Sequence, residues 1–182
     1  MPTEIESQVK ILEEQVKKLQ GQQAKDQLSI VVFSGDLDKV LAAMIIATGA
    51  RAMDMDVKMF FTFWGTTMLR DKNKSPKGKD LLSKMFGFML PKGSTKLKLS
   101  KLNMCGMGTA MLKDLMTKKH VASLEEMIAT AAELGVEINI CQMSMDLMGF
   151  KKEEMIDYPG LKYVGVGSYV SDADESRVQL FI

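Results

Sequence analysis

The sequence predicts an α/β fold of three layers, α/β/α, with a parallel or mostly parallel sheet of about five strands. Apolar, β-rich runs alternate with helical patterns along the chain, which is typical of strand–helix–strand units. The first of these runs, at 28–33, is almost continuously apolar, as expected for a strand that helices bury on both faces. An amphipathic N-terminal helix is added to this core.

Residues 1–26 form the first predicted unit, which is this helix and its linker. Apolar side chains recur with the 4-3-4-3 spacing of a heptad seam, which consists of Ile5, Val9, Leu12, Val16 and Leu19. A helix this short is marginal when it is isolated. The seam therefore indicates either a helix that packs on its own domain or a coiled-coil-like helix that joins copies of the chain. The sequence leaves both open.

Residues 27–182 form the second unit, the α/β domain. The strand at 28–33 leads through the turn Ser34-Gly35-Asp36 into a helix at 37–53. A second strand is predicted at 57–64 and is closed by Gly65, after which Thr66 or Thr67 could cap a helix. The later predicted elements are helices at 108–119, 123–134 and 142–148, a short helix at 171–175, and strands at 136–140, 162–166 and 178–182. The helix at 123–134 opens with a capping box.

An insertion at about 70–101 interrupts this rhythm. It contains an apolar helical patch at 81–90 and only two acidic residues. Its ten basic residues are Arg70, Lys72, Lys74, Lys77, Lys79, Lys84, Lys92, Lys96, Lys98 and Lys101. Such a segment is either a solvated face or a surface that contacts an anionic membrane or an acidic partner.

Composition limits the functional class. A formal net charge of +1 argues against a dedicated nucleic-acid binder. No run approaches the roughly 20 apolar residues of a membrane-spanning helix. Two cysteines do not make a disulfide framework, and the acidic N-terminus is not a signal peptide. We therefore expect a cytoplasmic protein, with peripheral membrane contact through 70–101 as an option.

No cofactor or metal is expected from the motifs. The turn after the first strand lacks both glycine-rich phosphate-binding patterns, and its acidic residues repel phosphate. The 17 methionines could supply soft ligands for Cu(I), but they are spread over helices and strands alike. Methionine is also a deformable filler of cores and interfaces, which is the simpler explanation.

Cys141 is the main candidate for a catalytic residue. It ends the predicted strand at 136–140 and directly precedes the predicted helix at 142–148. Ligands and chemistry gather at the carboxyl ends of strands in open α/β sheets. A helix N-terminus at that place favours the thiolate, which is the nucleophilic form of cysteine. The alternative is a structural cysteine buried in the core.

Cys105 is the second candidate. It lies in a glycine-punctuated loop, Asn103 to Gly108, before a helix, where a thiol could relay or resolve sulfur, or where a small residue could simply pack tightly. The single histidine, His120, is more simply explained as a feature of a helix C-terminus. Without a histidine placed beside the thiol, a hydrolase is disfavoured. Thiolate attack on a sulfane sulfur has no such requirement.

Four segments together resemble the DsrE/DsrF/DsrH-like superfamily of sulfur-relay proteins, in its Met-rich branch. They are VVFSGDLDK (31–39), VKMFFTFWG (57–65), NMCGMG (103–108) and INICQMSMDLMG (138–149). The resemblance implies a three-layer α/β fold, homo- or hetero-oligomers and a persulfide-bearing cysteine that matches Cys141. Cys105 matches a position seen in this branch. The insertion at 70–101 is absent from the compact relay members.

The function expected from these observations is that of a sulfur carrier or sulfurtransferase-like protein. Cys141 would accept sulfane sulfur as a persulfide and pass it to a partner thiol, so that sulfur-donor and sulfur-acceptor proteins are the expected partners. The alternative is a non-catalytic oligomeric scaffold, or a membrane-associated regulatory module, in which Cys141 is structural.

Overall fold

The computed structural model of the chain describes residues 4–21, 24–76 and 81–182. In the described part, five strands form one sheet in the order β4-β3-β2-β1-β5, and every neighbouring pair is parallel. The strands are β1 (Lys25–Val32), β2 (Asp56–Phe61), β3 (Glu137–Cys141), β4 (Lys162–Val164) and β5 (Ser176–Phe181). The predicted parallel sheet is confirmed.

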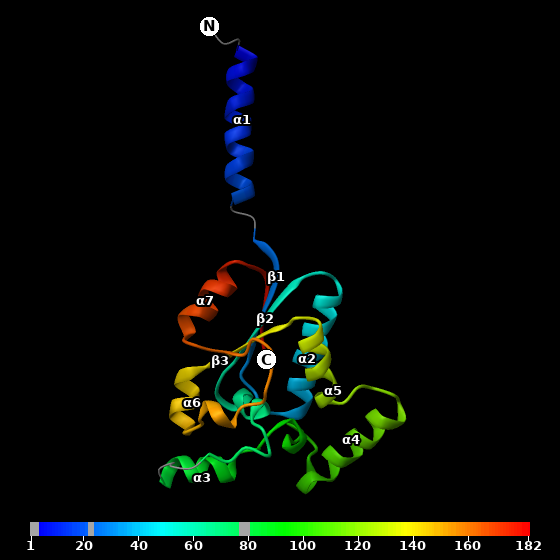
Figure 1. Cartoon of the computed structure of the whole chain (residues 1–182). Helices are drawn as coiled ribbons and strands as arrows, with labels where there is room; N and C mark the ends of the chain where they lie inside the picture. Colours follow the sequence, from blue (N-terminus) through cyan, green and yellow to red (C-terminus); the bar gives the residue numbers. More distant parts are fainter. Residues whose placement is uncertain (1–3, 22–23, 77–80) are drawn as a thin grey trace.

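Helices cover both faces of the sheet, as Figure 1 shows. On one face, α2 (Leu37–Ala52) and α5 (Leu124–Glu133) pack against each other, and α2 also contacts β1 and β2. On the other face, α7 (Val166–Asp174) contacts β1, β4 and β5. This is the predicted three-layer arrangement, and the predicted capping box at Ser123 and Glu126 is present at the start of α5.

The main core lies between the sheet and the layer of α2 and α5. Ile30, Phe61 and Ile140 are fully buried in it. Because side chains alternate along a strand, the residues next to these point to the opposite face. Phe60 and Cys141 accordingly belong to a separate, smaller cluster of buried residues. The candidate cysteine therefore lies in the thinner layer under α7.

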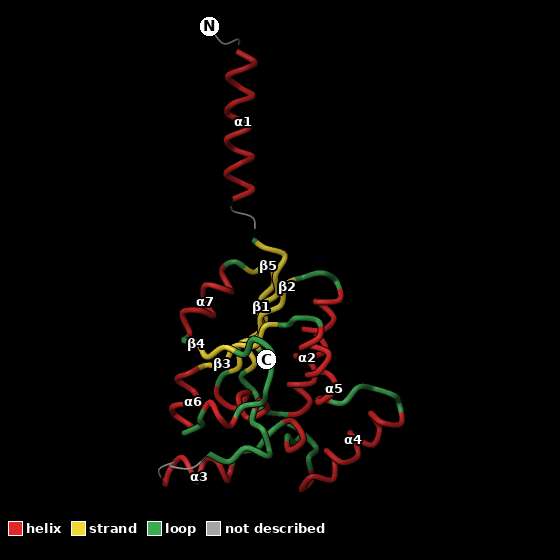
Figure 2. The backbone as a smooth tube through the Cα atoms, viewed as in Figure 1, coloured by secondary structure: helices red, strands yellow, loops and turns green. Residues whose placement is uncertain are grey.

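The N-terminal helix α1 (Glu4–Gly21) stands clear of the sheet, beyond the end where β1 begins (Figures 1 and 2). Its apolar seam is exposed: Ile5 is 72% exposed, Val9 46%, Leu12 58% and Val16 51%. The side chain of Leu19 lies outside the described part. Of the two interpretations of this seam, packing on its own domain is therefore wrong for the described residues.

The second strand ends earlier than the sequence predicts. β2 stops at Phe61, and residues Phe63–Leu69 form a 3₁₀ helix, η1, instead of continuing to Trp64. Phe63 has a φ of 44°, which no strand residue adopts. Gly65 then passes so close to β1 that a Cβ there would lie 2.2 Å from the carbonyl oxygen of Val32. The turn at the end of β1 leaves no room for a Cβ atom at position 65, so this position requires glycine.

The hydroxyl groups that follow this turn do not cap a helix as predicted. Thr66 Oγ1 and Thr67 Oγ1 each donate a hydrogen bond of 2.6 Å, to the carbonyl oxygens of Phe63 and Trp64. These bonds lie inside η1 and close its turns. Side-chain bonds back to the chain three residues earlier compete with a regular α-helix.

Helix α7 is longer than the predicted helix at 171–175, because it begins at Val166. Because glycine is a poor helix former, Gly165 and Gly167 make the start of this helix difficult to predict from the sequence. β5 begins correspondingly at Ser176, directly after the helix. The added first turn of α7 proves to lie over the candidate cysteine.

Segments of the insertion surround the end of the sheet where the strands terminate (Figure 2). They are α3 (Leu81–Met89) and η2 (Ser94–Lys96). After the insertion, η3 (Met104–Gly106) and α4 (Met107–Lys118) continue at the same end. Beyond them, α6 (Gln142–Met148) and η4 (Lys152–Glu154) complete this end of the molecule.

The insertion is not a uniformly exposed basic face. Arg70 is only 3% exposed and forms an ion pair with Glu154 of η4. Lys74 pairs with Asp157. Lys77 and Lys79 lie outside the described residues. A positive charge in the sequence of this segment therefore does not always lie on its surface.

Candidate functional site

Cys141 stands where the sequence predicts it, at the junction of a strand and a helix. It is the last residue of β3 and the N-cap residue of α6. Because all strands are parallel, this junction lies at the end of the sheet where ligands bind in open α/β folds. β4 lies alongside, with Val164 in register with Cys141.

The thiol is covered. Cys141 is only 2% exposed and forms a small apolar cluster with Val31 and Phe60. The partly buried residues that pack against this cluster are Phe33, Val164 and Tyr169. The ring of Tyr169, from the first half of α7, stacks on Phe60 with 5.3 Å between ring centroids. In this conformation the thiol is screened from any large reactant.

The two halves of α7 are held unequally. The second half is tied down by an ion pair between Lys58 of β2 and Asp172, and by hydrogen bonds from Gln27 and Gln179 to backbone carbonyls at 172 and 173. The hydrogen bond that Lys58 donates to Asp172 raises the pKa of Lys58, so the ammonium group of Lys58 stays charged at neutral pH. In the first half, Tyr169 is the residue that packs on the cysteine cluster.

Helix α6 is held by a buried hydroxyl group in its first turn. Ser144 is fully buried; its Oγ lies 2.9 Å from Thr62 Oγ1 and accepts a hydrogen bond of 3.0 Å from the backbone N–H of Phe63. These contacts join the turn after β2 to the helix that follows Cys141. Ser144 thereby fixes the position of the cysteine segment and supports the positive φ of Phe63.

A buried amide lies on the same face of β3 as the thiol. Asn139 precedes Cys141 by two residues, so both side chains point toward the α7 layer. Asn139 is 5% exposed, and its Oδ1 atom is buried without a hydrogen-bond partner. An unsatisfied polar atom of this kind is unusual in a folded protein. The Asn139 side chain therefore adds a polar group to the face of β3 that carries the thiol.

An open crevice adjoins the cysteine cluster on the side of β1. It has a volume of about 340 Å³ and is lined by Phe33, Ser34, Gly35, Asp36, Lys39, Trp64, Thr67, Leu90 and Pro91. Phe33 belongs to both the crevice and the cluster, and its ring lies 5.3 Å from that of Phe63 and 5.8 Å from that of Phe181. Phe33 is therefore the residue that the crevice and the cysteine cluster have in common.

Asp36 in this crevice is the N-cap residue of α2, but its side chain makes no capping bond. It accepts a hydrogen bond of 2.9 Å from Ser34 and pairs with Lys39 at 3.0 Å.

Cys105 lies in another part of the molecule. It is exposed and sits in η3, before α4, on a backbone with a φ of 58°. It is absent from the residues that surround Cys141. Figure 1 shows the start of α4 well separated from the junction of β3 and α6. The structure therefore does not bring the two candidate cysteines together, and both are free thiols.

His120 also lies away from Cys141. It lines a cavity of about 700 Å³ between α4 and α5, together with residues such as Leu37, Lys113, Thr117 and Ser123. Cys141 does not line this cavity. Over residues 4–21, 24–76 and 81–182, no group of three or more His, Cys, Asp or Glu side chains is gathered closely enough to hold a metal ion. Nor is any described helix both long and apolar enough to cross a membrane.

The structure defines an α/β protein with a parallel sheet and a cysteine at the carboxyl end of a central strand. Comparison with known proteins gives the family of this chain. Residues 24–181 match the model of the DsrE/DsrF/DrsH-like family. This chain belongs to that family. The match begins after α1, so the N-terminal helix is not part of the family domain.

Two relatives are similar over most of their length. The uncharacterized protein YrkE of Bacillus subtilis is 47% identical over 154 residues, which are 85% of this chain and 95% of that protein. The sulfur carrier protein DsrE2 of Allochromatium vinosum is 36% identical over 162 residues, 85% of this chain and 97% of that protein. These similarities support a sulfur-relay role.

A solved structure has the same fold. The YchN protein of E. coli superimposes with a TM-score of 0.53 over 86% of this chain and 98% of that one, at 11% sequence identity. At this identity the likeness concerns the fold alone, and it agrees with the three-layer arrangement.

Sequence reasoning missed Ser144, which holds the segment that follows Cys141, and Tyr169, which packs on the cysteine cluster. Ser144 lies three residues after Cys141, one helical turn away, and this spacing was a readable signal for a hydroxyl directed to the same side of the helix. No comparable signal existed for Tyr169. Its place over the cysteine depends on the packing of α7, which is a tertiary property.

Proposed function

We propose that this protein is a sulfur carrier in which Cys141 holds the transferred sulfur. The Cys141 thiolate attacks the outer sulfur of a donor persulfide, which gives a Cys141 persulfide and releases the donor thiolate. The thiolate of an acceptor protein then attacks the terminal sulfur of this persulfide and restores the Cys141 thiolate. One sulfur–sulfur bond forms and one breaks in each step, and no external oxidant or reductant is consumed.

The observation that carries this proposal is that a chain related to a sulfur carrier has a cysteine at the binding end of its sheet. The chain is 36% identical to a protein named as a sulfur carrier, and Cys141 ends a central strand at the binding end of the sheet. Ser144 and Thr62 hold the cysteine segment in place. Donor and acceptor proteins with reactive thiols are the partners that this chemistry requires, and a cytoplasmic location would keep both cysteines reduced.

The proposed cycle requires that donor and acceptor proteins can reach the Cys141 thiol. A thiol that is 2% exposed cannot meet a protein-bound persulfide, so the cover formed by Phe33 and Tyr169 has to move. The first half of α7 is the part that carries Tyr169 without the ties that hold Asp172. Opening there would uncover Cys141 while the sheet stays intact.

A second function is favoured by the same burial. A cysteine packed in an apolar cluster is a normal structural residue, and the protein would then be a scaffold without sulfur chemistry. Uptake of sulfur from a polysulfide separates the two functions. A carrier becomes persulfidated at Cys141, whereas a scaffold does not. Replacing Cys105 by serine should retain uptake and change only the rate at which a partner thiol removes the sulfur.

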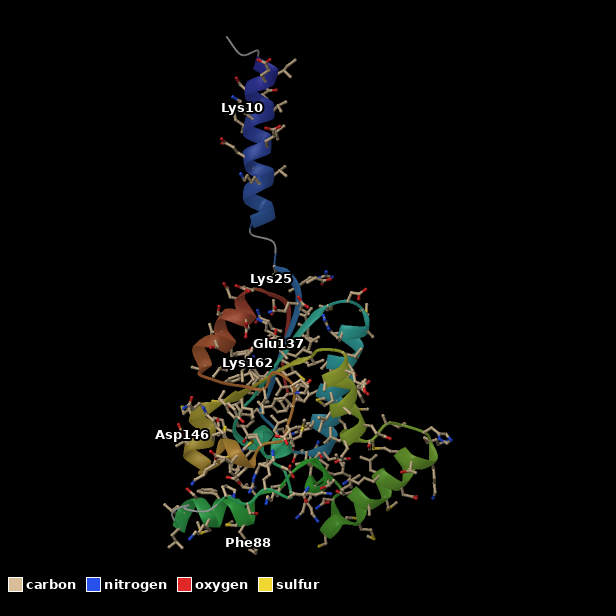
Figure 3. The ribbon with its side chains drawn as sticks, in the orientation of Figure 1. Lys10, Lys25, Phe88, Glu137, Asp146 and Lys162 are labelled. Atoms are coloured by element: carbon tan, nitrogen blue, oxygen red, sulfur yellow. The ribbon has the colours of Figure 1, made fainter. Side chains whose placement is uncertain are left out.

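We also propose that α3 contacts an anionic membrane surface. None of the described residues of α3 is buried, and Leu81 is 84% and Phe88 91% exposed. Figure 3 shows Phe88 on the outer side of α3, away from the sheet. Lys84 lies on the same helix and Lys92 follows it. Exposed apolar side chains beside lysines are typical of helices that lie in the membrane interface.

This contact is expected to appear as binding to vesicles that contain anionic lipid, and the binding should weaken as salt is added. Phe88→Ser should reduce the bound fraction by about ten-fold, because it removes one large apolar anchor. Met53→Ser is the matched control, since Met53 is 76% exposed at the end of α2. Co-sedimentation measures both. Absence of binding at low salt, or equal loss in the two variants, would exclude a membrane role for α3.

A further inference from the structure

We propose that α1 forms a parallel, two-stranded coiled coil with α1 of a second copy of this chain. The inference goes beyond the proposed function, because α1 precedes the family domain, which begins at residue 24.

Among the described residues, the seam is an apolar surface without a partner in its own chain. Ile5, Val9, Leu12 and Val16 lie between 46% and 72% exposed along one side of the helix. Apolar side chains at this regular spacing are the contact surface of a coiled coil and are otherwise unfavourable in water. α1 also lies well away from the domain in Figure 1, so a second helix can approach along its length.

The residue types along the seam select a pair of parallel helices. In heptad notation, Val9 and Val16 occupy a positions, and Ile5, Leu12 and Leu19 occupy d positions. Branched residues at a with leucine at d favour two parallel strands over larger bundles. Two of the three d positions are leucine, and both a positions are valine. The pattern therefore favours a pair of helices, and a second copy of α1 carries the matching seam.

The flanking residues favour the same orientation. In a parallel pair, g positions face the following e positions of the partner helix, which places Gln8 beside the partner's Glu13 and creates no like-charge pair. In an antiparallel pair, e positions face e positions, and Glu6 would lie beside the partner's Glu13. Like charges at this distance are destabilising. The parallel arrangement avoids this repulsion.

Pairing through α1 leaves the candidate site open. The helix leads into the start of β1, whereas Cys141 lies at the opposite end of the sheet, where the strands terminate (Figure 1). Two domains joined in this way would carry their cysteines away from the junction. A helix of 18 residues gives a short interface, so association through it is concentration-dependent, and contacts between the domains would strengthen it.

The first test compares the self-association of the full chain with that of two variants. Leu12→Glu places a charge in the seam and should weaken association at least about ten-fold. Ile11→Glu is the matched control, because Ile11 is 56% exposed but lies off the seam, and it should stay within about two-fold of the parent chain. Sedimentation equilibrium gives the association constants. Thermal unfolding of the domain should be the same in all three, since α1 does not pack on it.

The second test determines orientation. On a background of Cys105→Ser and Cys141→Ser, chains with Val16→Cys should form disulfide-linked dimers when oxidised glutathione is added as the oxidant, because a positions face each other in a parallel pair. A mixture of Ile5→Cys and Val16→Cys chains should give mainly the two homodimers. Preferred linkage between the two different variants would overturn the parallel arrangement. Association of Leu12→Glu as tight as that of the parent chain would overturn the coiled coil itself.

Discussion

Replacing Arg70 by methionine is expected to lower the free energy of unfolding by about 3–5 kcal/mol. The side chains of Arg70 and Glu154 are 3% and 2% exposed, and Arg70 Nη2 lies 3.2 Å from Glu154 Oε2. Methionine keeps most of the volume but leaves the Glu154 carboxylate buried without the guanidinium. The loss of a countercharge in such a place costs far more than the loss of a surface ion pair.

Arg70 also holds the insertion to the domain. Its guanidinium donates hydrogen bonds to the carbonyl oxygens of Gly87, Leu90 and Pro91, over 3.1–3.3 Å, and lies 4.5 Å from the ring centroid of Phe150. Burial lowers the pKa of Arg70 and Glu154 opposes this shift, so the group remains charged. The variant is therefore expected to release the end of α3 as well as to destabilise the fold.

Chemical denaturation measures this effect. Lys92→Met is the matched control, because Lys92 lies on the same segment and, among the described residues, donates a hydrogen bond to the exposed Ser75 Oγ over 2.8 Å. It should change stability by no more than about 0.5 kcal/mol. Adding Glu154→Gln to Arg70→Met should restore part of the loss, since the buried charge is then removed. A loss below about 1 kcal/mol in Arg70→Met would show that the ion pair does not hold this region.

Replacing Tyr169 by alanine should raise the alkylation rate of Cys141 by at least about ten-fold, because thiol reactivity depends on access as well as on ionisation. Tyr169 packs on the cluster that contains Cys141 and stacks on Phe60. Without its ring, the first half of α7 loses the contact that keeps it over the thiol. The rate is measured with iodoacetamide on a Cys105→Ser background, so that one cysteine is followed.

Two variants control for indirect effects. Val170→Ala changes the neighbouring residue of α7, which is 58% exposed, and should leave the rate near that of the parent chain. Tyr169→Phe keeps the ring and should also react slowly. Circular dichroism at the assay temperature verifies that each variant is folded. Equal rates in Tyr169→Ala and the parent chain would mean that another element covers the cysteine.

The elements that could be predicted from the sequence are those with strong local signals. The apolar run before Cys141 and the segment after it have the periods of a strand and a helix, and β3 and α6 follow them closely. The capping box at Ser123 defined the start of α5. At these places local preference and tertiary structure agree.

The errors occurred where tertiary contacts decide. β2 was predicted to continue to Trp64, but the positive φ of Phe63 is stabilised by Ser144, which lies 81 residues further along the chain. Arg70 was counted as a surface charge, although its partner Glu154 lies 84 residues away. The packing of Tyr169 on the Cys141 cluster is also a contact between distant parts of the sequence. Such long-range pairs leave no local pattern in a single sequence.

The most direct test of the proposed sulfur-carrier function is the mass of the intact protein and of its Cys141 peptide after incubation with a polysulfide. A sulfur carrier of this kind gains one sulfur atom on Cys141, which is retained in Cys105→Ser, absent in Cys141→Ser and removed by a reducing thiol. A Tyr169→Ala chain should take up the sulfur faster. An unmodified Cys141, in both the parent chain and the Tyr169→Ala variant, or sulfur found on Cys105 alone, would contradict the proposed function.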